Sequence, residues 1–168
     1  MALAGDPLEE AIIEDNTFSD SNVRFLKIHG IAPSEGEKSV MIRRNQLFNL
    51  NFPDRYGSLI ETGGFFSTNE LISFEFSDLT FRDVSFSRTG EIIKLRHQTV
   101  KPITLSSITV ENVNGGKIRL EAATSNHNGV PLEVVVEEST FRQLKGGPTH
   151  LFEVFADSEL LLKNCTFT

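Results

Sequence analysis

Paired carboxylates are the residues of this chain that could support acid–base chemistry. Glycan-cleaving enzymes hold two carboxyl groups about 5–9.5 Å apart, one as the acid and the other as base or nucleophile. The adjacent pairs Glu9-Glu10 and Glu137-Glu138 are the candidates. Neighbouring residues of a strand point to opposite faces, so neither pair converges on one site. The sequence therefore favours a protein that is not an enzyme, and a polysaccharide-degrading domain is kept as an alternative.

Metal binding is the second chemistry to consider. The histidines are His29, His97, His127 and His150. They show neither the His-Glu-x-x-His pattern nor pairs three to five residues apart. The single Cys165 cannot form a disulfide within the chain. Asp20 and Asp83 occupy equivalent places in a repeat and could share Ca²⁺, but Leu50 is expected between them, so a turn role is preferred. No cofactor is predicted.

The charge balance restricts the partners. The chain carries 23 acidic and 16 basic residues, a formal net charge of −7, and no basic run longer than Arg43-Arg44. Nucleic-acid binders present a basic face, so no nucleic-acid partner is expected. No apolar run approaches the roughly 18 residues of a membrane span, so no direct membrane insertion is expected. The 14 Phe residues and the absence of Trp favour strands.

A Thr-Phe landmark recurs at a period near 30 residues. It stands at Thr17-Phe18, Thr80-Phe81, Thr140-Phe141 and Thr166-Phe167, and Leu47-Phe48 and Thr109-Val110 fill the gaps. Such a period is typical of solenoid coils. The second residues of the landmarks are predicted to stack as an inward ladder: Phe18, Phe48, Phe81, Val110, Phe141 and Phe167.

Two further columns repeat with the landmark. Asp and Asn tolerate a left-handed backbone, and the position three before the landmark is predicted to be a turn column: Asp15, Asn45, Asp78, Ser107, Glu138 and Asn164. A third strand follows each landmark, as in Leu26-Lys27-Ile28. Its middle residues are expected to form an outward charged column: Lys27, Glu61, Lys94, Arg119 and Glu153.

These columns predict an all-β fold, a single-stranded right-handed parallel β-helix of about six coils with three short strands each. No stretch of ten residues shows the 3.6-residue period of an amphipathic helix. Residues 1–10 are expected to be a lead-in or cap. Residues 11–168 are expected to be the β-helix, as a fragment of a longer solenoid.

The variable segments between coils are candidate ligand loops, because insertions in repeat proteins gather on one binding face. The segments Gln98–Pro102 and Thr124–Pro131 supply the candidate residues His97, Gln98, Asn126, His127 and Asn128. An outward apolar strip, interrupted by Glu75 and Thr104, is a second candidate surface. The strip consists of Ile12, Ile42, Val135 and Leu161.

The landmarks, the Asp/Asn turn and the glycine-led third strand resemble β-helix repeats of the pectin-lyase-like superfamily. Phe48-Asn49-Leu50-Asn51 is similar to the Phe-x-x-Asn tetrapeptide of polymorphic outer-membrane (autotransporter) passengers, although their Gly-Gly-Ala-Ile motif is absent. Ciliate β-helix repeat proteins are also similar. The resemblance implies an extracellular or cell-surface location.

Three functions follow as hypotheses. The first is a non-catalytic structural or adhesive scaffold that contacts a protein or glycan surface. The second is a polysaccharide-binding or polysaccharide-degrading domain. The third is a filament subunit that associates end to end, because open β edges invite pairing.

Overall fold

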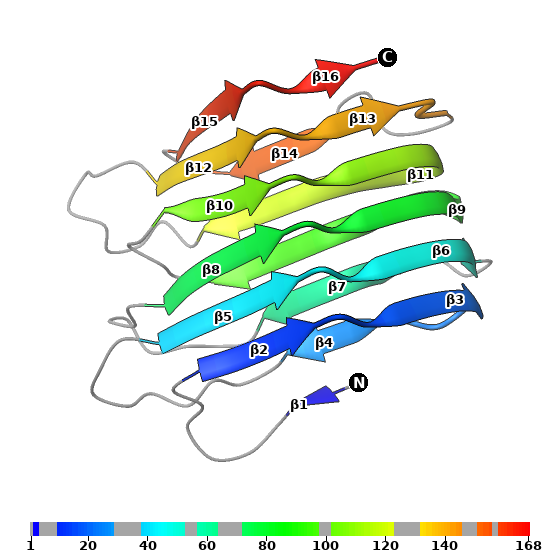
Figure 1. The fold of residues 1–168 in the computed structure, drawn as a ribbon, viewed down its shortest axis with the longest axis horizontal. Coiled ribbons are helices and arrows are strands. Elements are labelled where there is room, and N and C mark those ends of the chain that lie inside the picture. Colours follow the sequence, from blue (N-terminus) through cyan, green and yellow to red (C-terminus); the bar gives the residue numbers. More distant parts are fainter. Residues whose placement is uncertain are drawn as a thin grey trace.

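The computed structural model describes residues 2–3, 10–28, 38–52, 57–63, 72–97, 102–122, 132–145, 151–155 and 158–168. They form an all-β parallel solenoid of about four turns without a helix, which confirms the predicted fold class (Figure 1). The number of turns is slightly lower than the six or so coils that the landmarks predicted. The division at residue 10 stays a prediction, since residues 4–9 lie outside the described part.

The first face of the solenoid is a six-stranded parallel sheet with one strand from each repeat. Its strands are β2 (Glu10–Glu14), β5 (Lys38–Arg43), β8 (Ile72–Ser77), β10 (Ile103–Ser106), β12 (Leu132–Glu137) and β15 (Ser158–Lys163). Side chains alternate in and out along it: in β2, Ala11 and Ile13 are buried while Glu10 and Ile12 are exposed. This period-two pattern is what a half-buried strand requires.

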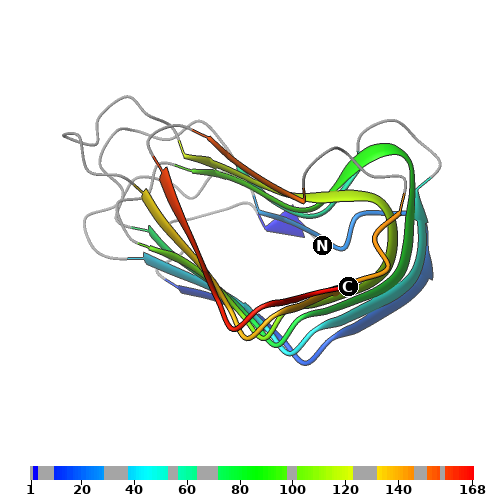
Figure 2. The same ribbon diagram turned by 90° about the horizontal axis from the view of Figure 1, so that it is seen from above.

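The second and third faces form one ten-stranded parallel sheet that bends around a corner (Figure 2). The second face holds β3 (Thr17–Ser21), β6 (Gln46–Phe52), the first parts of β9 (Thr80–His97) and β11 (Thr109–Ala122), β13 (Thr140–Arg142) and β16 (Thr166–Phe167). The third face holds β1 (Ala2–Leu3), β4 (Leu26–Ile28), β7 (Ser58–Gly63), the last parts of β9 and β11, and β14 (Phe152–Phe155).

The corner between the first and second faces is a single residue with a left-handed backbone. Positive φ angles between 52° and 57° occur at Asp15, Arg44, Asp78, Ser107, Glu138 and Asn164. The prediction of Asn45 in this column is wrong, because the second repeat is offset by one residue. Arg44 takes the turn with a φ of 52°, and Asn45 becomes the next residue, which is fully buried.

The same offset corrects the inward ladder. Leu47 pairs with Phe18 on one side and with Phe81 on the other, so Leu47 holds the place predicted for Phe48. Phe48 pairs with Ser19 and Arg82 and points outward, because adjacent residues of a strand face opposite sides. The ladder of the structure is Phe18, Leu47, Phe81, Val110, Phe141 and Phe167.

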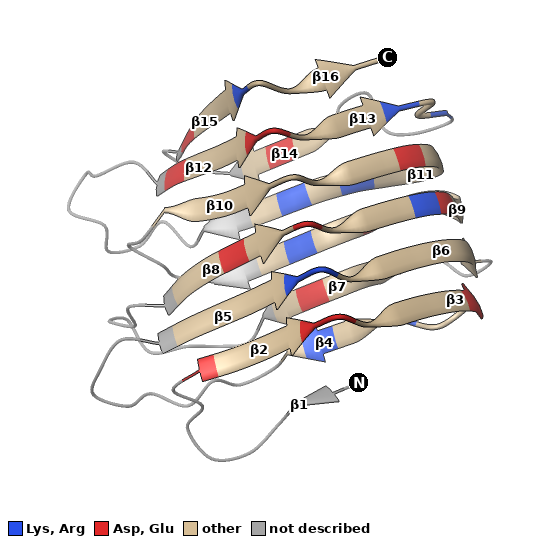
Figure 3. Ribbon diagram, in the orientation of Figure 1, with Lys and Arg blue, Asp and Glu red and all other residues tan. Residues whose placement is uncertain are grey.

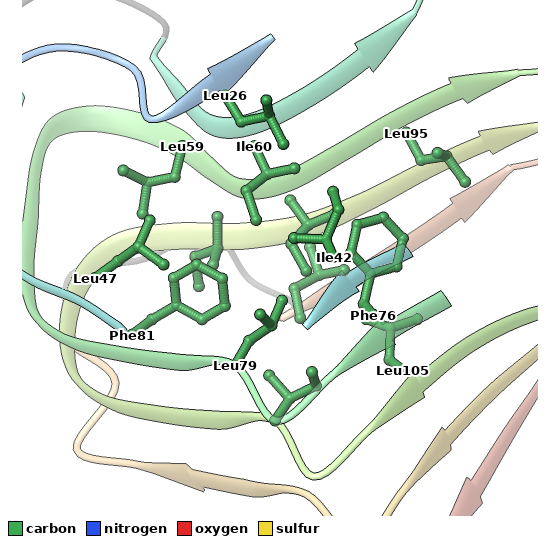
Figure 4. Close-up of a cluster of buried hydrophobic side chains, with 14 of the residues drawn as sticks. Leu26, Ile42, Leu47, Leu59, Ile60, Phe76, Leu79, Phe81, Leu95 and Leu105 are labelled. Atoms are coloured by element: carbon green, nitrogen blue, oxygen red, sulfur yellow. The ribbon is translucent and has the colours of Figure 1, made fainter. Parts of the chain in front are cut away.

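The ladder, apart from the exposed Phe167, lies within or against one continuous core that all three faces line (Figure 4). Phe76 and Leu105 reach it from the first face, Phe81 from the second and Ile60 from the third, and all four are fully buried. Burial of one such side chain contributes about 1.5–3 kcal/mol. The stack of apolar columns therefore stabilises the parallel pairing of the repeats.

Gly90 permits a close approach at the corner between the second and third faces. A Cβ atom placed on Gly90 would lie 2.0 Å from Cδ1 of Phe86, a separation that no side chain can occupy. The Phe86 ring stacks on Phe52 with 5.2 Å between ring centroids. Glycine at position 90 is therefore what lets the aromatic pair fill this corner.

Candidate binding and assembly surfaces

The outward side of the second face carries a column of hydroxyl groups. Consecutive repeats pair in register at Thr17, Gln46, Thr80, Thr109, Thr140 and Thr166. The neighbouring strands of a sheet are about 4.8 Å apart. The second face therefore presents a regular row of hydroxyls, interrupted only by the Gln46 amide, which is suited to a ligand that is itself extended.

A second outward column runs beside the hydroxyls and mixes an aromatic ring with charges. Its members are Ser19, Phe48, Arg82, Glu111 and Arg142. Figure 3 shows a basic, an acidic and a basic position in turn on the second-face parts of β9, β11 and β13. The Arg82 guanidinium lies 5.8 Å from the centroid of the Phe48 ring, within the range of a cation–π interaction. We call the two columns together the Thr–Arg face.

An exposed column of turn residues follows the Thr–Arg face. Positive φ angles occur at Asp20, Asn49, Asp83, Asn112 and Gln143. Sequence reasoning expected Leu50 between Asp20 and Asp83, but Leu50 pairs with Ser21 and Val84, so Asn49 lies between the two aspartates.

Amide groups in this column separate the carboxylates. Asn49 Nδ2 lies 3.4 Å from Asp20 Oδ1, and Asn112 Nδ2 donates to Asp83 Oδ1 at 2.6 Å. The amides supply hydrogen-bond donors to the carboxylates in this column. In the described residues no three His, Cys, Asp or Glu side chains gather as a metal site.

The third face carries the predicted charged column, and the register brings its members together. Lys27 pairs with Glu61, Glu61 with Lys94, Lys94 with Arg119, and Arg119 with Glu153. Figure 3 shows the resulting blue and red positions on β4, β7, β9, β11 and β14. We call this surface the charged face.

Ion pairs join neighbouring repeats on the charged face. Arg24 Nη1 lies 3.1 Å from Glu61 Oε2, and Arg119 Nη1 lies 3.7 Å from Glu91 Oε1. Lys117 pairs with Glu153. The buried Glu91 also accepts a hydrogen bond from Ser58 Oγ at 2.9 Å. These side chains form ion pairs with the neighbouring repeat, so they stabilise the stacking of the coils.

A second charge cluster joins the first two repeats at the corner turn. Arg44 Nε donates to Asp15 Oδ1 at 2.8 Å, and Arg43 Nε donates to Glu14 Oε2 at 2.6 Å. The hydrogen bond from Arg43 lowers the pKa of Glu14, and the hydrogen bond from Arg44 lowers the pKa of Asp15. The same contacts hold the pKa of the Arg44 guanidinium above its usual range, with Asp15 as the main cause.

Two asparagines stack inside the same corner. Asn45 Oδ1 accepts from the backbone N–H of Asn16 at 3.0 Å and from Asn16 Nδ2 at 2.9 Å. Asn45 Nδ2 donates to the carbonyls of Ile13 and Arg43, each at 2.9 Å. Sequence reasoning placed Asn45 in the turn itself, because Asn is a common turn residue. The slipped Val40-Met41-Ile42 strand of this repeat was the signal for the correct register.

The predicted ligand loops fall mostly outside the described residues. The backbone of His97 ends β9, while Gln98, Asn126, His127 and Asn128 are not described. The predicted apolar strip is partly wrong: Ile42 is fully buried, and Met41 pairs with Ile12 in the outward column. The remaining members differ in exposure, since Ile12 and Leu161 are exposed and Val135 is buried.

The fold and these surfaces define the protein as a parallel β-solenoid whose polar side chains link successive repeats. Comparison with protein-family models, curated proteins and solved structures finds no match. Within the described residues, no helix has the length and apolar character needed to cross a membrane.

Proposed function

We propose that this protein is a non-catalytic structural and adhesive scaffold. The observation that carries the proposal is that, among the described residues, several charged and amide side chains bond to the next repeat. Arg44 with Asp15, Asn45 with Asn16, and Lys117 with Glu153 each join two neighbouring repeats. Such links stiffen a rod in which each repeat contacts only its neighbours.

The Thr–Arg face is the contact surface of the proposed scaffold. It combines a flat row of hydroxyls with the aromatic–guanidinium pair of Phe48 and Arg82. Flat aromatic faces stack on apolar faces of ligands, and hydroxyl and guanidinium groups supply hydrogen bonds to polar ones. A polysaccharide chain offers both kinds of surface at regular intervals, so a glycan surface is the proposed partner. The resemblance to pectin-lyase-like repeats supports an extracellular or cell-surface location.

Binding to immobilised polysaccharides tests this proposal. Polygalacturonate and the neutral glucan laminarin serve as probes, with affinity measured by surface plasmon resonance. We expect Phe48→Ala to weaken binding by up to about tenfold, the loss of one aromatic contact. Lys27→Ala on the charged face is the matched control and should leave affinity unchanged. Equal losses in both variants, or no binding by the wild type, would contradict the assignment of the face.

The polysaccharide-degrading alternative is tested with the same polymers. Wild-type protein is incubated with polygalacturonate in the presence of Ca²⁺, and unsaturated and reducing ends are assayed. We expect no release above a boiled control. Release of either product would replace the scaffold proposal with a catalytic one.

A further inference from the structure

The central charges of the Thr–Arg face are not paired with one another. Glu111 is the register partner of Arg82 on one neighbouring strand and of Arg142 on the other. Within the described residues, neither Glu111 nor Arg142 takes part in an ion pair. Arg82 Nε lies 3.7 Å from Asp83 Oδ2, and 53% of the Arg82 side chain is exposed. These groups can therefore contact a ligand without first breaking links between repeats.

Two columns of left-handed turn residues border the Thr–Arg face, and both carry carboxylates. On the side of the first face, the corner turn holds Asp78 and Glu138. On the opposite side, Asp83 takes the turn in β9, directly after Arg82. All three carboxylate residues are exposed. The hydroxyl row of the Thr–Arg face therefore runs between two acidic borders.

The charge of this surface in the third to fifth repeats is negative. Four carboxylates and two guanidinium groups give a sum of −2: Asp78, Asp83, Glu111 and Glu138 with Arg82 and Arg142. The whole chain carries −7. A polyanion approaching such a surface is repelled both locally and by the protein as a whole, whereas an uncharged ligand is not.

The polar groups of the face match the hydroxyl groups of a neutral sugar. A carboxylate only accepts hydrogen bonds, and a guanidinium only donates them, whereas a hydroxyl does both. Glu111 therefore supplies an acceptor between the donors of Arg82 and Arg142, and Thr80 and Thr109 in the neighbouring column accept or donate. Each sugar hydroxyl finds a partner on such a surface. A uronate chain would add a carboxylate that Glu111 repels.

We propose that the ligand of the Thr–Arg face is a neutral glycan chain, and that Glu111 discriminates against acidic polysaccharides. The inference rests on the proposed scaffold function and names the class of glycan that the scaffold binds. The chain lies across the strands, in the direction of the hydroxyl row and of the charged column beside it. An acidic chain that reached Arg82 and Arg142 in this direction would pass directly over Glu111, and repulsion of the wrong ligand is one source of specificity.

A cationic partner is the alternative for a face of net negative charge. Arg82 and Arg142 are both exposed at the centre of the face, where they would repel a polycation, while the carboxylates of Asp78 and Asp83 stand at its borders. Salt separates the two ligands experimentally. Attraction between exposed charges is screened by salt, whereas stacking and hydrogen bonding to a neutral chain are not.

Surface plasmon resonance with the two immobilised polymers tests the glycan class, with a chelator present so that no divalent cation bridges carboxylates. We expect the wild type to bind laminarin at least about tenfold more tightly than polygalacturonate, and laminarin affinity to change little up to about 0.5 M salt. Glu111→Gln keeps the shape of the side chain and removes its charge. It should strengthen polygalacturonate binding by about two- to fivefold and leave laminarin affinity within about twofold.

Glu133→Gln is the matched control, because it makes the same change of net charge at an exposed position of the first face. It should leave both affinities unchanged. Equal gains in polygalacturonate binding by Glu111→Gln and Glu133→Gln would show that Glu111 has no local role. Tighter binding of the wild type to polygalacturonate, or laminarin binding that is lost in salt, would overturn the neutral class while leaving a glycan-binding scaffold. Binding of neither polymer would instead contradict the proposed function itself.

Discussion

The middle and outer repeats build the same corner from opposite kinds of side chain. The residue that follows the left-handed turn points into the corner of each repeat, in the order Asn16, Asn45, Leu79, Ile108, Ser139 and Cys165. Leu79 and Ile108 in the middle are fully buried and apolar. The corner residues of the first two and last two repeats bear an amide, a hydroxyl or a thiol.

The difference is not one of burial, because Asn45 and Ser139 are as deeply buried as Leu79 and Ile108. The apolar corner side chains are stabilised by leaving water. A buried polar side chain needs hydrogen-bond partners, and the polar corners have them: Ser139 Oγ accepts from the N–H of Ile108 at 3.0 Å, and Asn45 Oδ1 accepts from the N–H of Asn16. Burial holds the middle together, and hydrogen bonds and ion pairs hold the first two repeats.

Truncation of ladder residues should show the largest difference in stability between the middle repeats and the last repeat. Phe81→Ala removes a fully buried ring and should lower the free energy of unfolding by about 3–5 kcal/mol. Phe167→Ala removes a ring that is 50% exposed and should cost less than half as much. Urea denaturation followed by circular dichroism measures both. Equal losses would mean that the end repeat is as well covered in solution as the middle.

Removal of the asparagine corner should affect the first two repeats alone. Asn45→Ala leaves the N–H of Asn16 and the carbonyl of Ile13 without their partner, at a cost of about 1–3 kcal/mol. Asn51→Ala changes an exposed asparagine in β6, the strand that follows Asn45, and is the control, with an expected change within about 0.5 kcal/mol. Hydrogen exchange should show faster opening of β2 and β5 in Asn45→Ala, while β8 and β10 keep their protection. Uniform loss of protection would argue against a locally stabilised end.

The corner between the first and second faces also shows which parts of the fold could be predicted from the sequence. The repeat period, the parallel register and five of the six ladder residues follow from the Thr-Phe landmarks. The second repeat was misaligned because Phe48 looked like the landmark aromatic and Asn45 looked like a turn residue. The arginine at the turn carries no turn signal of its own, since Arg44 holds its left-handed backbone beside Asp15 of the preceding repeat. Contacts between repeats stabilise that register, and its signal in the sequence was the offset Val40-Met41-Ile42 strand, not the turn residue.

Removal of a buried hydroxyl on the third face should raise the free energy of unfolding by a smaller amount. Thr62 lies in the inward column between Ile28 and Leu95. Its Oγ1 is buried without a hydrogen-bond partner among the described residues. Thr62→Val keeps the branched shape and removes the unsatisfied group, so we expect stabilisation of about 1 kcal/mol. Thr109→Val, at a partly exposed outward position, is the control and should be close to neutral. Destabilisation by Thr62→Val would show that the hydroxyl has a partner in solution.

The smallest expected effect is a dependence of stability on pH that arises from the charge cluster of the first two repeats. Glu14 and Asp15 have pKa values lowered below their ordinary 4.5 and 3.8, so the native state binds fewer protons than the unfolded state near those values. Their contribution is therefore present above about pH 5 and is lost as the pH falls through the lowered pKa values. Arg44→Gln removes one of the two arginines that lower them. We expect its Tm to fall less than that of the wild type between pH 5 and pH 2.5. Arg142→Gln on the Thr–Arg face should follow the wild-type profile. Because the cluster is exposed, added salt should reduce the difference, and a difference that persists in 1 M salt would indicate a cause other than these ion pairs.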